Sequence, residues 1–160
     1  MIYNTKINKN KAFMYEYLEP LIDITKFVFV LLNHMSDIDT VKAIDAYYQT
    51  SDIRLKMDKG NWMALNKGSK QILLSVNLDN CYEENPQKID GIMLYWIANI
   101  YTKWQWNHPE LTSKDINEKC PVTTLMKLYY PLHETSDEKA IEILNNRYFG
   151  LNKEKGEEDE

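Results

Sequence analysis

The segment IDGIMLYWIANIYTKWQW, residues 89–106, decides the fold of this chain. Apolar and aromatic side chains occupy nearly every position of its helical repeat, so no side of the predicted helix is polar. In a globular protein such a helix is buried on all sides. His108-Pro109 ends it, because the residue before a proline is disfavoured in the helical region. The sequence therefore predicts a central buried helix over 88–106.

Upstream of this segment, residues 12–35 carry a second helical pattern. Its apolar residues step by four and three, which keeps them on one face of a helix. They are Tyr17, Leu21, Ile24, Val28, Leu31 and Met35. Pro20 interrupts the pattern, since a proline is tolerated in the first turn and disruptive deeper in a helix. We expect a short helix before Pro20 and a long helix after it.

Residues 61–78 are ambiguous between strand and helix. Ile72, Leu74, Val76 and Leu78 recur at every second position, which is typical of a half-buried strand, and the NKGSK turn at 66–70 would complete a hairpin. Ile72, Leu73 and Val76 also fit a helical face. The sequence leaves both alternatives open and predicts at most one β-hairpin in this region.

Downstream, short helical patterns follow with clear capping and stop signals, and the last runs from about 136 to 149 before Gly150. The fold class predicted is mainly α, a compact helical bundle around the helix at 88–106. Residues 1–150 are expected to form one helical domain, with an N-terminal lobe at about 12–80 and a C-terminal lobe at about 86–150. Residues 151–160 are expected to form a disordered acidic tail.

Composition and charge narrow the classes of function. The net charge of the 160-residue chain is −5, which disfavours broad electrostatic capture of nucleic acid. The longest strictly apolar run is FVFVLL at 27–32, too short to span a membrane. The two cysteines form no CxxC pair, and MIYNTKINKNK at the start of the sequence is polar and basic rather than a secretory signal. We expect a cytoplasmic protein with reduced thiols and no membrane partner.

The segment 129–136, YYPLHETS, places a histidine beside a glutamate and admits two interpretations. In the structural one, Thr135 and Glu138 begin the last helix, and His133 bonds to a carbonyl of the preceding helix and packs on a tyrosine. In the functional one, His133 acts with Glu134 or Cys120 as the catalytic group of a small enzyme. We favour the structural interpretation. A zinc protease would need HExxH, which is missing here, so no metal and no cofactor are predicted.

Residues 38–78 also fit a winged helix-turn-helix, in which two helices and a short turn precede a hairpin. Basic side chains outnumber acids in its second half. They are Arg54, Lys56, Lys59, Lys67 and Lys70. A recognition helix over 51–59 with a basic wing would bind DNA. The QTSD turn lacks the glycine common in such motifs, and the acidic chain disfavours this alternative.

Aromatic side chains on the central helix exceed what one helical face can bury. We expect some of them to reach the surface, where exposed aromatic residues mark contacts with partner proteins. The candidates for partner binding are Tyr101, Trp104 and Trp106.

Three segments resemble a group of small helical proteins from low-GC Gram-positive bacteria and mobile elements. They are LYWIANIYTKWQW (94–106), TSKDINEK (112–119) and LMKLYYPLHETSDEKAIEIL (125–144). The shared motifs are a YWIxxIYxxW helix and a YxxLHxxS step into a closing helix, within about residues 90–146. The last part is similar to short helical proteins often encoded beside ADP-ribosyltransferase toxins. The resemblance implies a toxin–antitoxin or defence setting and carries no catalytic residues with it.

Together these features favour a non-enzymatic protein-interaction or regulatory protein, resembling an antitoxin, whose partner is another protein such as a cognate toxin or defence component. The alternatives are a DNA-binding regulator that uses 38–78 and a small enzyme built on His133. Sequence patterns do not give the oligomeric state.

Overall fold

The computed structural model describes residues 15–150, and this part of the chain is a bundle of helices without a β-strand. The helices are α2 (Tyr15–His34), α3 (Thr40–Thr50), α4 (Asp52–Asp58), α5 (Trp62–Leu65), α6 (Ser69–Leu74), α7 (Gly91–Asn107), α8 (Ser113–Lys119), α9 (Val122–Leu132) and α10 (Asp137–Phe149). The mainly α prediction is therefore confirmed. The acidic tail predicted at 151–160 lies outside the described residues.

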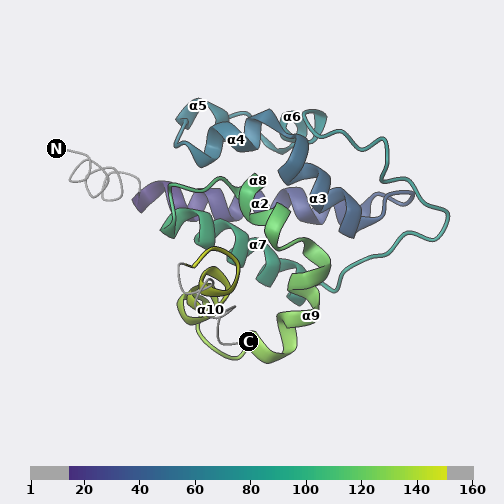
Figure 1. The fold of residues 1–160 in the computed structure, drawn as a ribbon. Helices are drawn as coiled ribbons and strands as arrows, with labels where there is room; N and C mark the ends of the chain where they lie inside the picture. The colour runs from purple at the N-terminus through teal and green to yellow at the C-terminus, as the bar shows by residue number, and fades with distance from the viewer. Residues whose placement is uncertain (1–14, 151–160) are drawn as a thin grey trace.

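The two longest helices, α2 and α7, lie side by side and antiparallel at the centre of the bundle (Figure 1). The end of α2 meets the start of α7, where the Asn33 amide donates to the Ile89 carbonyl at 2.8 Å and accepts from the Ile89 N–H at 3.1 Å. Further along, the Thr102 hydroxyl lies 3.5 Å from that of Thr25. This pair of helices forms the frame on which the others pack.

Helices α8, α9 and α10 cover the remaining sides of α7, so the predicted central helix is buried along most of its length. Asp90 caps it by accepting a hydrogen bond from the Ile92 N–H at 3.1 Å. Its buried apolar residues include Leu94, Ile97, Ile100 and Trp104. The prediction of an interior helix is confirmed, except that Ile92 and Tyr95 near its start are exposed.

The ambiguous segment at 61–78 is helical: α5 and α6 occupy it, and the hairpin alternative is not formed. Ile72 and Val76, four residues apart, are both buried, whereas Leu74 between them is 82% exposed. A strand would have placed all three side chains on one face. Apolar alternation was misleading here because Leu74 is a surface residue.

The connection between α6 and α7 is long and projects from the body of the bundle (Figure 1). It is fixed by polar contacts to the start of α3. The Lys88 ammonium donates to the carbonyls of Met35 and Ile38, and the Asp39 carboxylate accepts from the Gln87 N–H while also capping α3. A single antiparallel bridge, Ile38 to Tyr82, adds to this anchorage.

A buried polar cluster joins α4 to three other parts of the fold. The Arg54 guanidinium donates to the Thr25 hydroxyl at 2.7 Å, to the Tyr47 hydroxyl at 3.1 Å and to the Asp58 carboxylate at 3.1 Å. The other oxygen of Asp58 accepts from both the N–H and the hydroxyl of Ser113, each at 2.7 Å. Asp58 therefore ties α4 to the beginning of α8.

None of the helices within 15–150 combines the length and the apolar character that crossing a membrane would require.

Candidate protein-interaction surface

The outer side of α2 carries an apolar stripe that no other described helix covers completely. Its members recur at helical spacing and therefore share a side of α2. They are Pro20, Ile24, Phe27 and Val30. Phe27 is 53% exposed, although it belongs to the most apolar stretch of the chain. A single exposed apolar residue is common, whereas a contiguous exposed apolar patch such as this stripe is typical of a contact surface.

A groove of about 930 Å³ follows this stripe. Leu65 and Asn66 line it from the end of α5, and Tyr95 lines it from α7. Both helices contact α2, and Figure 1 shows α2 between them. From Glu19 to Val30 the groove extends along roughly 16 Å of α2, at about 1.5 Å of rise per residue. We call it the α2 groove.

Tyr95 forms the aromatic wall of the α2 groove and is 46% exposed. The Lys26 ammonium lies 5.2 Å from the centre of its ring, a cation–π distance that orients the ring at the groove. Ile92, one turn earlier on the same side of α7, is also exposed. Two helices that are distant in sequence thus bring Phe27 and Tyr95 to one surface.

An acidic ridge borders the α2 groove. Glu19 and Asp23 line the groove, and Glu16 precedes them by one turn on the same side of α2. All three side chains are exposed, and none forms an ion pair with another residue of 15–150. Within the described residues, the charges of the ridge are therefore not neutralised by a basic side chain.

The prediction that Tyr101, Trp104 and Trp106 bind a partner is wrong for Tyr101 and Trp104 and stays a prediction for Trp106. Tyr101 and Trp104 are fully buried, and their polar atoms are used internally. The Tyr101 hydroxyl donates to the Cys120 carbonyl at 2.6 Å, and the Trp104 indole donates to Asn145 at 2.9 Å. Trp106 is half-buried and packs against the core. The surplus aromatic residue on α7 is Tyr95, at the opposite end of the helix.

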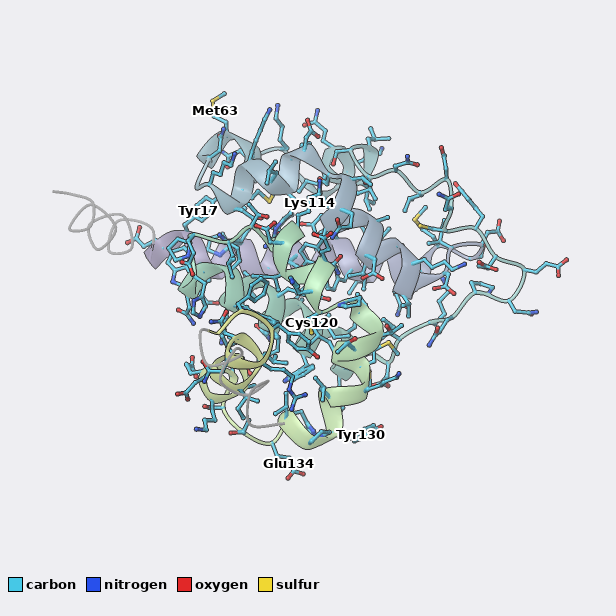
Figure 2. The ribbon with its side chains drawn as sticks, viewed as in Figure 1. Tyr17, Met63, Lys114, Cys120, Tyr130 and Glu134 are labelled. Atoms are coloured by element: carbon cyan, nitrogen blue, oxygen red, sulfur yellow. The ribbon has the colours of Figure 1, made fainter. Side chains whose placement is uncertain are left out.

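The catalytic candidates of the enzyme alternative do not converge. The His133 ring stacks on Tyr129 with 4.2 Å between ring centres, and its Nδ1–H donates to the Tyr129 carbonyl at 2.8 Å. Glu134 is exposed and extends away from the body at the far end of α9 (Figure 2). These contacts confirm the structural interpretation, in which His133 belongs to the joint between α9 and α10. Among the described residues, Glu134 forms no contact that would orient the His133 ring for catalysis, so that pairing was predicted wrongly.

Cys120 is also unsuited to nucleophilic chemistry. It is fully buried where α8 ends, well away from Glu134 in Figure 2. Burial raises the pKa of its thiol to about 12, whereas a nucleophilic cysteine needs an accessible thiolate. Cys81 is buried as well, and burial raises the pKa of its thiol above 9.0. Both cysteines are free thiols.

Two features of the DNA-binding alternative are not formed: the β-hairpin wing and the exposed position of Arg54. The proposed wing is the pair of short helices α5 and α6, and Arg54 is buried in the polar cluster rather than presented to solvent. Four lysines of that prediction are exposed. They are Lys56, Lys59, Lys67 and Lys70. No group of three or more His, Cys, Asp or Glu side chains within 15–150 is placed to hold a metal ion.

A second hollow, of about 450 Å³, lies between α3 and the α6–α7 connection. Asp45 lines it and accepts hydrogen bonds from the Asn117 amide at 2.8 Å and the Val122 N–H at 3.1 Å. Burial raises the pKa of the Asp45 carboxyl above 3.8, and this effect outweighs the two hydrogen bonds, which lower the pKa. The carboxylate is therefore engaged in joining α3 to α8 and α9.

Sequence reasoning missed the α2 groove, although one signal was present. Phe27 does not belong to the four-and-three stripe of residues 17–35, so its large ring was surplus to the predicted core face. Tyr95 gave no comparable signal, because its helix is apolar on nearly all sides.

No family model, curated protein or solved structure matches the chain.

Proposed function

We propose that this chain is a non-enzymatic protein-interaction protein that binds a partner protein in the α2 groove. The observation that supports the proposal most directly is that Phe27 and Tyr95, from two different helices, are both about half exposed and line the same groove. Aromatic residues in such pockets dominate the binding energy of protein interfaces.

The energetic reason is the apolar surface that the groove leaves in contact with water. Fully burying a large apolar side chain contributes about 1.5–3 kcal/mol. Covering the exposed halves of Phe27 and Tyr95, with Ile24 beside them, would yield part of that amount for each residue. A partner that fills the groove gains this energy without displacing any described element.

The biological setting that we propose is regulatory and cytoplasmic, with a cognate toxin or another defence component as the partner. The resemblance of residues 90–146 to helical proteins encoded near toxins supports this choice. The two free thiols suit a reducing compartment. The separation of His133, Glu134 and Cys120 favours binding over the catalysis considered for these residues.

Affinity capture tests the proposal. The full chain serves as bait in a lysate of the organism that encodes it and in co-expression with the product of the adjacent gene. A variant combining Phe27→Ser and Tyr95→Ser is compared with Tyr130→Ser. Tyr130 is the matched control because it is 72% exposed and lies at the far end of α9 (Figure 2).

We expect a specific partner to be retained by the wild type and by Tyr130→Ser and to be lost with the double variant. Recovery of the same proteins with all three baits, or of none with the wild type, would contradict the proposal.

Nucleic-acid binding is the second candidate, supported only by the exposed Lys56, Lys59, Lys67 and Lys70. None of these lysines forms an ion pair with a described residue. If they bind phosphates, the affinity for DNA falls steeply with salt, and Lys56→Glu combined with Lys59→Glu abolishes it. Absence of binding at low salt would remove this candidate.

A further inference from the structure

We infer that the occupant of the α2 groove is a basic amphipathic α-helix of the partner protein. This inference rests on the proposed function and specifies the chemistry of the bound segment. Its apolar residues would fill the groove, and lysine or arginine residues along one edge would face the acidic ridge.

The walls of the groove favour a helix over an extended peptide. An extended peptide gains affinity by pairing its backbone with an exposed sheet edge. The groove is lined by side chains of α2, α5 and α7, whose backbone groups are largely paired within their own helices. A bound segment must therefore satisfy its own backbone hydrogen bonds, as a helix does.

The dimensions and the spacing of the groove point to the same conclusion. The stripe on α2 places apolar side chains three or four residues apart over about 15 Å, which is close to three turns of an opposing helix. Helices that bind in grooves do so through anchors at this spacing. Phe27 and Tyr95 would pack on either side of such anchors.

The charges around the groove favour a bound helix that is positively charged. Glu16, Glu19 and Asp23 stand at intervals of three and four residues along one edge, without ion pairs among the described residues. The cation that lines the groove is Lys26, which is engaged with the Tyr95 ring. A helix with lysine or arginine on the facing edge complements this ridge, whereas an acidic helix is repelled by it.

A second copy of this chain is a less favourable occupant. Two copies joined through the groove would bring two acidic ridges into one interface, with Lys26 as the compensating charge from each groove. Like charges placed together at an interface are unfavourable.

Binding of designed peptides tests the inference. Two synthetic helices of about 18 residues share one leucine stripe at helical spacing and differ in carrying either lysine or glutamate along its edges. Their affinities for the full chain are measured by fluorescence anisotropy at about 50 mM and about 300 mM salt, and the higher salt shortens the screening length about 2.4-fold. We expect the lysine peptide to bind at least about tenfold more tightly at low salt and the difference to shrink at high salt.

Variants locate the binding site of the peptide. Glu19→Gln combined with Asp23→Asn should weaken binding of the lysine peptide about three- to tenfold and leave the glutamate peptide unaffected or slightly improved. Glu134→Gln is the matched control, because Glu134 is exposed at the far end of α9. Equal affinities for the two peptides, or equal effects of Glu134→Gln and the ridge variant, would overturn the inference.

Photo-crosslinking separates this inference from the proposed function. A benzophenone side chain replaces Phe27, and the segment of the captured protein joined to it is sequenced. A partner joined through a basic amphipathic segment supports the inference. A partner joined through an acidic or non-helical segment overturns the inference and leaves the proposed function standing. A crosslink to another copy of this chain also overturns the inference, because the occupant is then a second copy. A second variant, in which the benzophenone replaces Tyr130, gives the background level. If the variant at Phe27 captures no more protein than this background, the proposed function is contradicted.

Discussion

Arg54 and Asp58 form an ion pair across one turn of α4, with 3.1 Å between Nε and Oδ1 and only 1% of each side chain exposed. One Arg54 nitrogen, Nη2, is buried and has no hydrogen-bond partner among the described residues. The two rings of Tyr47 and Tyr48 lie 5.7 Å and 5.3 Å from the guanidinium carbon and partly compensate by cation–π attraction. The most basic residue of the predicted DNA-binding segment is thus part of the interior.

Removal of the Arg54 side chain should destabilise the protein strongly. Arg54→Ala leaves the Asp58 carboxylate buried, with Ser113 as its remaining hydrogen-bond donor among the described residues. Removing one partner of a buried ion pair costs about 3–5 kcal/mol. Urea unfolding followed by circular dichroism measures the loss. Lys56→Ala, on the exposed side of the same helix, should change the free energy of unfolding by no more than about 0.5 kcal/mol. Equal effects of the two substitutions would refute the burial of Arg54.

Removal of an aromatic side chain should affect stability differently at the two ends of α7. Trp104→Ala removes a fully buried ring and should lower the free energy of unfolding by about 3–5 kcal/mol. Tyr95→Ser removes a ring that is about half exposed and should cost about 1 kcal/mol or less. Thermal unfolding of both variants provides the comparison. A larger loss from Tyr95→Ser would show that its ring belongs to the core and would weaken the case for the α2 groove.

Both cysteine thiols should be protected in the folded protein. Cys120 and Cys81 are buried, and burial raises the pKa of the Cys120 thiol to about 12, so a thiol reagent at mildly alkaline pH finds little accessible thiolate. Reaction with a chromogenic disulfide should be slow in buffer and complete for two thiols after unfolding in urea. A Tyr130→Cys variant supplies an exposed thiol as the control and should react rapidly. Rapid reaction of the wild type would contradict the packing of α8 and of the α6–α7 connection.

The Asp45 carboxyl should make stability depend on pH. Burial raises the pKa of Asp45 above 3.8, so the folded protein holds this proton more tightly than the unfolded chain does. The contribution of Asp45 to stability is therefore largest below pH 3.8 and declines as the pH rises through the raised pKa. Asp45→Asn keeps an oxygen acceptor for Asn117 and Val122 and removes the titrating charge.

The difference in melting temperature, variant minus wild type, should therefore become more positive from pH 3 to pH 7, with 3.8 as the ordinary pKa of the group. Asp79→Asn is the control, since Asp79 is exposed. A difference that becomes more negative over this range would show that Asp45 is stabilised as the carboxylate.

His133 should contribute to stability as a packed and hydrogen-bonded side chain. His133→Ala loses both the stacking on Tyr129 and the bond to its carbonyl, with an expected cost of about 1–3 kcal/mol. His133→Phe keeps the stacking and should lose roughly half as much. Urea unfolding of the two variants gives the ratio. No loss from either substitution would indicate that the joint between α9 and α10 is held by other residues.

Capping and burial signals explain why much of the fold could be predicted from the sequence. Ser51 caps α4, and Thr112 forms a capping box with Asp115, so both helices begin after residue types that favour this position. The apolar character of α7 predicted its central position. Thr135 was expected to cap the last helix because Glu138 lies three residues after it; Ser136 caps the helix instead, and its hydroxyl accepts a hydrogen bond from the Lys139 N–H.

The candidate site could not be predicted because it depends on which apolar residues remain uncovered. Phe27 and Phe29 are two residues apart in one apolar run, yet Phe29 is fully buried and Phe27 is exposed. The position of α5 and α7 around α2 decides this difference, and that position is set by contacts far apart in sequence. Pro20 was expected to divide α2, and the helix instead continues through it from Tyr15 to His34, with Pro20 on the exposed side.

Helix α7 is exposed at Ile92 and Tyr95 and buried at Ile97, Ile100 and Trp104. Its exposed and buried positions are therefore under different constraints. Substitutions at the buried positions, Leu94 and Trp96 included, are limited by folding, whereas a substitution at Tyr95 is not. If the α2 groove binds a partner as proposed, an exchange of that partner for another would be accompanied by replacement of Tyr95, while the buried residues of the same helix turns stay as they are.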